Sequence, residues 1–127
     1  MIIVDTSVLI DFLRGATTSA AQRLAQLEAD EVPFAIPLVC LQEVLQGARD
    51  EREWRLLHDY LASQRLLEAR EPLALHVEAA RIFFDCRRRG VTVRSTVHCV
   101  IAAEVLRNKG TLLHDDEDFE RMVKVRP

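Results

Sequence analysis

This sequence is poor in cysteine, and it has neither a long hydrophobic run nor a low-complexity stretch. Its three cysteines, Cys40, Cys86 and Cys99, are odd in number, fit no zinc-binding spacing and each lie in an apolar segment. We therefore expect buried, reduced thiols rather than a disulfide framework or a zinc site. Because repeats and linkers are also lacking, the chain is expected to form one domain over residues 1–127.

No apolar run approaches the ~20 residues of a membrane span, so we expect no membrane association. The opening MIIVDTSVLI lacks the basic flank and the small-residue cleavage site of a signal peptide. These two absences predict a cytoplasmic protein.

Neither sign of charge dominates, because 17 Lys and Arg residues stand against 20 Asp and Glu residues, a net charge of −3. This balance does not by itself predict a nucleic-acid binder. It does not exclude a nuclease either, since acidic catalytic groups can stand beside a local basic strip. A chain of 127 residues can bury roughly two thirds of its unfolded surface, enough for one core.

Short β-branched runs alternate with helical patterns along the chain. The run Ile2-Ile3-Val4 is apolar on both faces, as in a central parallel strand. Further strands are expected at residues 32–38, 65–69, 111–113 and 123–125. Helices are expected from Thr6 or Ser7 to Arg14, after a cap within residues 17–19, and over residues 39–47, 50–63, 72–89, 95–108 and 115–122. This alternation predicts an α/β protein with three layers, α/β/α, around a central and mainly parallel sheet.

Four polar residues are expected to meet at one edge of that sheet. Asp5 follows the first strand and Asp116 follows the strand at 111–113, so both lie where parallel strands end and ligands bind. Glu43 and His98 lie in the early turns of helices that begin near the same edge. Carboxylates ~4 Å apart repel by about 4 kcal/mol per pair at an effective dielectric near 20, and a cation relieves this repulsion. Hard oxygen ligands favour Mg²⁺ or Mn²⁺, which can activate water for attack on a phosphodiester.

Each acid also has a simpler reading. Asp5 and Asp116 are good helix N-caps, and Glu43 is an ordinary solvated helix residue. Only their conjunction points to a metal site.

Three segments then resemble one family. The opening VDTSVLIDFLRG, the middle LQEVLQGA and the closing VIAAEVLRNKGTLLHDDEDFERM resemble the PIN-domain ribonucleases, most of all the VapC toxins of bacterial toxin–antitoxin pairs. The resemblance covers nearly the whole chain. It implies a PIN-like α/β/α fold, RNA cleavage that depends on Mg²⁺ or Mn²⁺, homodimers and higher assemblies, and inhibition by a cognate VapB antitoxin.

The resemblance also implies site residues. By position, Asp5 is the first family acid, Glu43 the second, and Asp116 the acid after the last motif strand. Asp118 is an accessory acid that binds metal or orients the site. Thr6 or Ser7 is expected to hydrogen-bond a ligand.

One position departs from the family pattern, because His98 stands where the family usually has Asp, three residues before Ile101. A neutral imidazole prefers softer ions than Mg²⁺, whereas an imidazolium takes the place of a cation. Three readings stay open: a change, engineered or selected, that lowers toxicity; a natural ligand that prefers Mn²⁺; or a PIN fold that has kept binding and lost catalysis.

Arginines supply the remaining candidates. Arg87, Arg88 and Arg94 belong to the one concentrated basic stretch and are candidates for contacting RNA or antitoxin, as is Arg14. The alternative for the stretch is a solvated helix C-terminus favoured by the helix dipole.

The leading prediction is a metal-dependent endoribonuclease toxin. The alternative from another class is an impaired PIN module that binds antitoxin and RNA without cleaving. A third hypothesis is a phosphotransfer site like that of the haloacid dehalogenases, with Asp5 as nucleophile. Such sites have a second Asp two residues after the first, but this chain has Ser7 at that position.

Overall fold

A computed structural model describes residues 1–126 of the chain. Residue 127, the last of the predicted domain, lies outside the described residues. The chain divides into two compact units. The first comprises Met1–Glu68 and Thr111–Asp115, and the second comprises Ala69–Gly110 and the residues from Asp116 onward.

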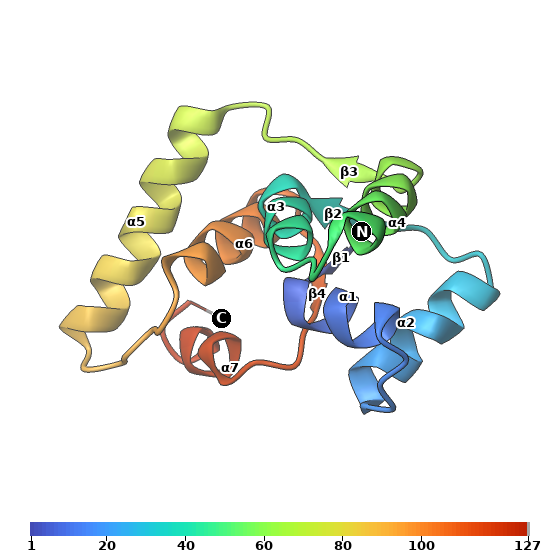
Figure 1. The fold of residues 1–127 in the computed structure, drawn as a ribbon. Helices are drawn as coiled ribbons and strands as arrows, with labels where there is room; N and C mark the ends of the chain where they lie inside the picture. Colours follow the sequence, from blue (N-terminus) through green and yellow to red (C-terminus); the bar gives the residue numbers. More distant parts are fainter. Residues whose placement is uncertain (127) are drawn as a thin grey trace. The chain divides into compact units, whose positions relative to one another are not determined.

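The first unit is built on a four-stranded sheet in the order β3-β2-β1-β4 (Figure 1). The strands are β1 (Ile2–Val4), β2 (Phe34–Pro37), β3 (Leu66–Leu67) and β4 (Thr111–Leu113). All three pairings are parallel, and Val4 lies opposite Leu113. Ile3 and Val4 are fully buried, as the apolar run at the start of the chain predicted. The predicted α/β class and parallel sheet are confirmed.

Proline is tolerated in β2 because of its position. Pro33 precedes the strand, and Pro37 ends it and serves as N-cap of the following helix. Prolines at strand ends need not break the hydrogen-bond ladder. The strand is therefore shorter than the predicted segment 32–38.

Four helices complete the first unit: α1 (Thr6–Leu13), α2 (Ser19–Ala29), α3 (Leu38–Gln46) and α4 (Glu51–Ala62). The expectation that Thr6 or Ser7 caps α1 is wrong. The alternative interpretation of Asp5 as a helix N-cap is confirmed, because its side chain accepts from the Ser7 amide. Thr18 and Asp50 cap α2 and α4 through their side chains. Strand β1 thus passes into α1 through one acidic residue.

The second unit contains three helices: α5 (Pro72–Arg88), α6 (Thr96–Arg107) and α7 (Glu117–Val123). α5 and α6 pack together through buried side chains that include Ile82 and Ile101. Ser95 stands at the N-cap of α6 as predicted, but its side chain makes no capping hydrogen bond to any described residue.

The predicted strand at residues 123–125 is wrong. Helix α7 runs to Val123, and the Val125 amide then donates to the Met122 carbonyl in a turn. Phe119, Met122 and Val125 are all buried. Their spacing of three residues suits one face of a helical turn. The apolar residues at 123–125 therefore belong to a helix end and not to a strand.

Cys40, Cys86 and Cys99 are free and buried, as predicted. Burial raises the pKa of the Cys40 thiol to about 12 and that of Cys99 to about 11. None of the helices within residues 1–126 has the length and apolar character needed to cross a membrane.

Candidate metal centre

Asp5 is the most deeply buried of the predicted acids in the first unit. It follows β1, and its amide donates to the Leu113 carbonyl at 3.0 Å, which extends the pairing of β1 with β4. Its Oδ2 accepts from the Ser7 hydroxyl at 2.8 Å. Asp5 is only 1% exposed, and its Oδ1 has no hydrogen-bond partner among residues 1–126. A buried carboxylate oxygen without a partner is costly, and a cation is one group that satisfies it.

Glu43 is held by a hydroxyl from the neighbouring helix. The Thr6 side chain on α1 donates to Glu43 Oε1 on α3 at 2.6 Å, a short bond typical of a charged acceptor. Burial is the main reason why the pKa of the Cys40 thiol is raised, and the negative charges of Asp5 and Glu43 raise it further. Both carboxylates therefore lie near Cys40, and each accepts a hydrogen bond from a hydroxyl group of α1.

His98, Asp116 and Asp118 form a compact group in the second unit. One candidate ligand atom from each lies within 4.8 Å of the others. His98 is the third residue of α6, as expected, and Asp116 is the N-cap of α7, where Oδ1 accepts from the Asp118 amide at 2.8 Å. His98 Nε2 lies 3.7 Å from Asp116 Oδ2. One nitrogen and several carboxylate oxygens are donors that fit a divalent cation.

Asp118 is fully buried and anchors this group. Its oxygens accept from the backbone amides of Arg94 and Ser95 at 3.0–3.2 Å and from the Arg121 guanidinium at 3.1 Å. The His98 Nδ1 atom lies 2.7 Å from Asp118 Oδ2. Burial is the largest influence and raises the pKa of Asp118, but the bonds from His98 and the two amides outweigh it and leave the pKa below its ordinary value.

These bonds decide which nitrogen His98 offers. A carboxylate held ionised is an acceptor only, so Nδ1 carries the proton that it shares with Asp118. The ring also packs against Phe119, with centroids 4.8 Å apart. Nε2 is consequently the ring nitrogen that remains for a metal ion or substrate, in the arrangement by which a carboxylate orients a ligating histidine. Asp118, with both oxygens already engaged, orients this site more readily than it binds an ion.

The structure thus places the predicted site residues in two groups. Asp5, Glu43, Thr6 and Ser7 belong to the first unit, and His98, Asp116 and Asp118 to the second. Their union in one site stays a prediction. Thr6 or Ser7 was expected to hydrogen-bond a ligand, but Glu43 was not predicted as the partner of Thr6, nor was the bonding of Asp118 to the start of α6. These contacts join residues far apart in sequence, without a local pattern that would predict them.

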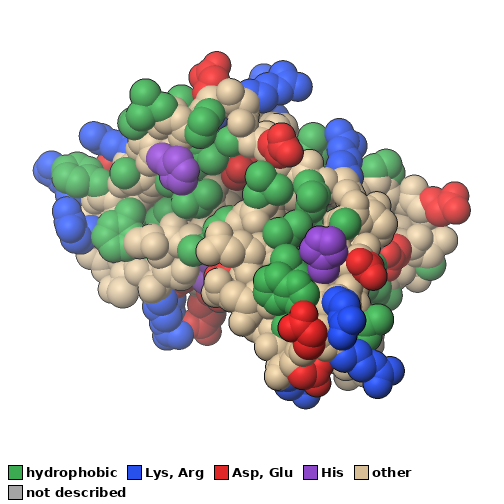
Figure 2. All heavy atoms as spheres, turned by 45° about the horizontal axis from the view of Figure 1, so that its top comes forward, with side chains coloured by type: hydrophobic (Ala, Val, Ile, Leu, Met, Phe, Trp, Pro, Cys, Tyr) green, Lys and Arg blue, Asp and Glu red, His purple; other side chains and the backbone are tan. Residues whose placement is uncertain are grey.

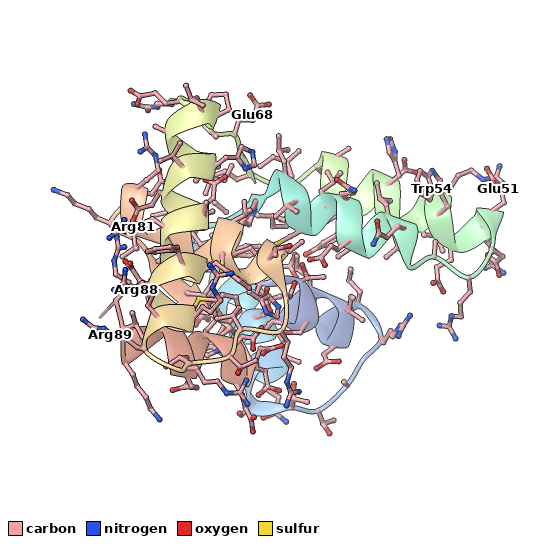
Figure 3. The ribbon with its side chains drawn as sticks, turned by 90° about the vertical axis from the view of Figure 1, so that its left-hand side faces the viewer. Glu51, Trp54, Glu68, Arg81, Arg88 and Arg89 are labelled. Carbon is pink, nitrogen blue, oxygen red and sulfur yellow. The ribbon has the colours of Figure 1, made fainter. Side chains whose placement is uncertain are left out.

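The predicted arginines differ in their surroundings. Arg94 contributes its backbone amide to Asp118, whereas its side chain is exposed. The guanidinium groups of Arg87 and Arg88 lie over the ring of Phe84 on α5. Arg14 lines a hollow of about 360 Å³ in the first unit, whose other lining residues are Ile10, Leu13, Val44, Gly47, Arg49, Glu53, Leu56, Leu57 and Tyr60. Trp54 on α4, labelled in Figure 3, is 42% exposed and is not a core residue.

Comparisons with known proteins identify the family. The sequence model of the PIN domain matches residues 2–125. The ribonuclease VapC11 of Mycobacterium tuberculosis is 30% identical over 128 residues, which cover 98% of this chain and 93% of that protein. The structure of VapBC-1 from nontypeable Haemophilus influenzae matches with a TM-score of 0.73 and 19% identity, over 98% of this chain and 95% of that one. A toxin–antitoxin complex from Klebsiella pneumoniae matches with a TM-score of 0.71 and 18% identity, over 94% and 90% of the two chains. The predicted PIN-like fold is therefore confirmed, and the chain belongs to the PIN-domain family and, within it, to the VapC ribonucleases.

Proposed function

We propose that this chain is the toxin of a VapBC-type pair and hydrolyses RNA phosphodiester bonds with the help of Mg²⁺ or Mn²⁺. Similarity to a named ribonuclease over 98% of the chain supports the reaction. The observation that most favours a bound cation is the buried Oδ1 of Asp5, which has no hydrogen-bond partner in the described part of the chain. We further propose that residues 1–127 act as a single PIN domain in the cytoplasm.

We propose that Asp5, Glu43, His98 and Asp116 act in one active site. Chain connectivity supports this. The Asp5 amide bonds to the Leu113 carbonyl, and Asp116 is the third residue after Leu113. Three residues of chain span at most about 11 Å, which limits the distance between Asp116 and Leu113 and so supports the proposal.

In this site, Asp5, Asp116 and His98 Nε2 would hold the metal ion. The ion, when bound, neutralises the carboxylates and lowers the pKa of a water molecule. Asp118 keeps the His98 ring oriented through Nδ1. Glu43, fixed by Thr6, takes the proton that the attacking water loses.

His98 makes Mn²⁺ the better partner of the two ions. Mg²⁺ prefers oxygen ligands in a strict octahedron, whereas transition-metal ions bind imidazole more readily. The same residue favours one alternative, an impaired PIN module that binds antitoxin and RNA without cleaving. That alternative applies if the imidazole weakens metal binding instead of contributing to it.

We also propose that a VapB-type antitoxin binds and inhibits the chain, and that the chain forms a homodimer within a larger assembly. The matched complexes from Haemophilus influenzae and Klebsiella pneumoniae support an antitoxin partner.

RNA cleavage by the purified chain tests the proposed function. We expect cleavage with Mn²⁺, weaker cleavage with Mg²⁺, none in EDTA, and a loss of at least about 100-fold in Asp5→Asn. Asp30→Asn, which alters an exposed acid at the C-cap of α2, should cleave like wild type. RNA binding without cleavage under any metal would favour the impaired module, and cleavage that persists in EDTA would contradict metal dependence.

A further inference from the structure

Arginine side chains line a second hollow, at the C-terminal end of α5 in the second unit. The hollow has a volume of about 500 Å³ and is lined by Arg81, Asp85, Arg88, Arg89, Val125 and Arg126. Figure 3 shows Arg81, Arg88 and Arg89 along one side of α5, pointing away from the helix. In Figure 2, basic and hydrophobic side chains gather at the left-hand margin, the side on which Figure 1 draws α5.

Among residues 1–126, positive charge in this hollow exceeds the available negative charge. Asp85 is shared, with Arg81 at 3.0 Å and Arg126 at 3.4 Å, and Arg126 also pairs with Glu78. Four guanidinium groups therefore face two carboxylates. Arg88 and Arg89 have no ion pair with any carboxylate of residues 1–126.

The helix dipole alone does not account for this cluster. The C-terminus of a helix carries about half a negative charge, which suits one neighbouring cation. Here Arg126 is added from the far end of the chain, and Arg89 and Arg88 remain without carboxylates. An arrangement with an excess of guanidinium groups suits a ligand with several negative charges.

An aromatic ring lies on the same helix face. Arg81, Phe84, Asp85 and Arg88 follow the spacing of neighbours on one side of a helix. Phe84 is 37% exposed, and the guanidinium carbons of Arg81 and Arg88 lie 5.2 and 5.6 Å from its ring centroid. These contacts hold the arginines in place before a ligand arrives, which lowers the entropy lost on binding.

We propose that this hollow and the adjoining face of α5 bind the phosphodiester backbone of single-stranded RNA, with Arg88 and Arg89 on phosphates and Phe84 beside a base. A positive groove with an exposed aromatic ring is the combination by which proteins hold single strands without reading sequence. The identity of the nucleic acid rests on the proposed function, whereas the site itself rests on the charges and contacts above.

Salt-dependent RNA binding tests this site separately from catalysis. Fluorescence anisotropy of a labelled, unstructured RNA is measured in EDTA over about 0.05 to 0.2 M salt, so that metal-dependent cleavage does not interfere. The variant Arg88→Gln/Arg89→Gln removes two exposed charges outside the metal centre. We expect binding to weaken about tenfold, and the slope of log affinity against log salt to fall by about 1.4 for two lost phosphate contacts.

The control removes an equal charge from another helix. Arg52 and Arg55 are exposed on α4, and Arg52→Gln/Arg55→Gln should leave the slope within about half a unit of wild type. Circular dichroism of both variants checks their folding.

An unchanged slope in the α5 variant, an equal fall in the control, or no RNA binding by wild type would overturn the inference. Tighter binding of poly-L-glutamate than of RNA would also overturn it and point to an acidic protein segment. If the wild-type chain bound RNA but did not cleave it with Mn²⁺, the proposed function would be refuted, whereas the inferred RNA-binding site would still stand.

Discussion

At the scale of single residues, His98 and Asp118 decide what kind of centre this chain can form. Asp118 is buried, ionised and bonded to the His98 ring and to the backbone ahead of α6. A carboxylate at position 98 would therefore stand next to a buried carboxylate, whereas the imidazole satisfies it. In this chain His98 is thus part of a matched pair as well as a departure from the family pattern.

Replacing this histidine by the usual family residue should weaken the protein without metal and change its metal preference. We expect His98→Asp to lower the free energy of unfolding by about 2 kcal/mol in EDTA, because a bond to a buried charge is lost and like charges approach. Mg²⁺ should restore much of this stability and raise Mg²⁺-supported RNA cleavage. Urea unfolding with and without Mg²⁺ measures the first effect.

The matched control is His58→Asp, since His58 is exposed on α4. This variant should change the unfolding free energy in EDTA by no more than about 0.5 kcal/mol, and its response to Mg²⁺ should equal that of wild type. If His98→Asp behaves like this control, His98 limits neither stability nor metal choice.

Residue types and local order revealed the acids, but they did not reveal the partners of the acids. Asp5 and Asp116 could be selected because each follows an apolar strand, and Glu43 because its helix was expected to begin near the same sheet edge and its segment resembles a family motif. Arg94, Ser95 and His98, which bond to Asp118, lie 20 to 24 residues away from it, and Thr6 lies 37 residues from Glu43. Such contacts depend on helix packing, which a single sequence does not specify.

At the scale of elements, α1 links the sheet to Glu43 on α3. It begins on Asp5 at the end of β1, and it packs against α3, so that Thr6 reaches Glu43. Helix periodicity and caps predicted α1 to α7 with shifts of one or two residues at most ends. The false strand at 123–125 arose because a short apolar run fits a strand or a helical turn equally well.

The link between α1 and α3 predicts a specific kinetic defect. Thr6→Val preserves the side-chain shape and removes the hydroxyl that holds Glu43. We expect kcat for RNA cleavage to fall about tenfold with little change in KM, because the carboxylate loses its orientation and not its charge. Stability should fall by only about 1–2 kcal/mol.

Thr17→Val serves as the control because Thr17 is exposed before α2. Equal kcat values for Thr6→Val and wild type would show that Glu43 needs no anchor from α1.

At the scale of the whole molecule, the order of motifs carried the assignment further than composition did. The net charge of −3 gave no sign of a nucleic-acid enzyme. The opening, middle and closing motifs resemble those of the VapC toxins in their order, and the PIN-domain match over residues 2–125 and the 30% identity to VapC11 bear this out. The predicted joining of Asp5 and Glu43 in the first unit with His98 and Asp116 in the second stays a prediction.

A crystal structure of the chain soaked in Mn²⁺, with anomalous scattering to locate the ion, tests this union most directly. We predict one anomalous peak about 2.0–2.3 Å from oxygens of Asp5 and Asp116 and from His98 Nε2, with Asp118 still bonded to Nδ1. A peak that lacks either Asp5 or His98, or no peak at saturating Mn²⁺, would contradict the shared metal centre.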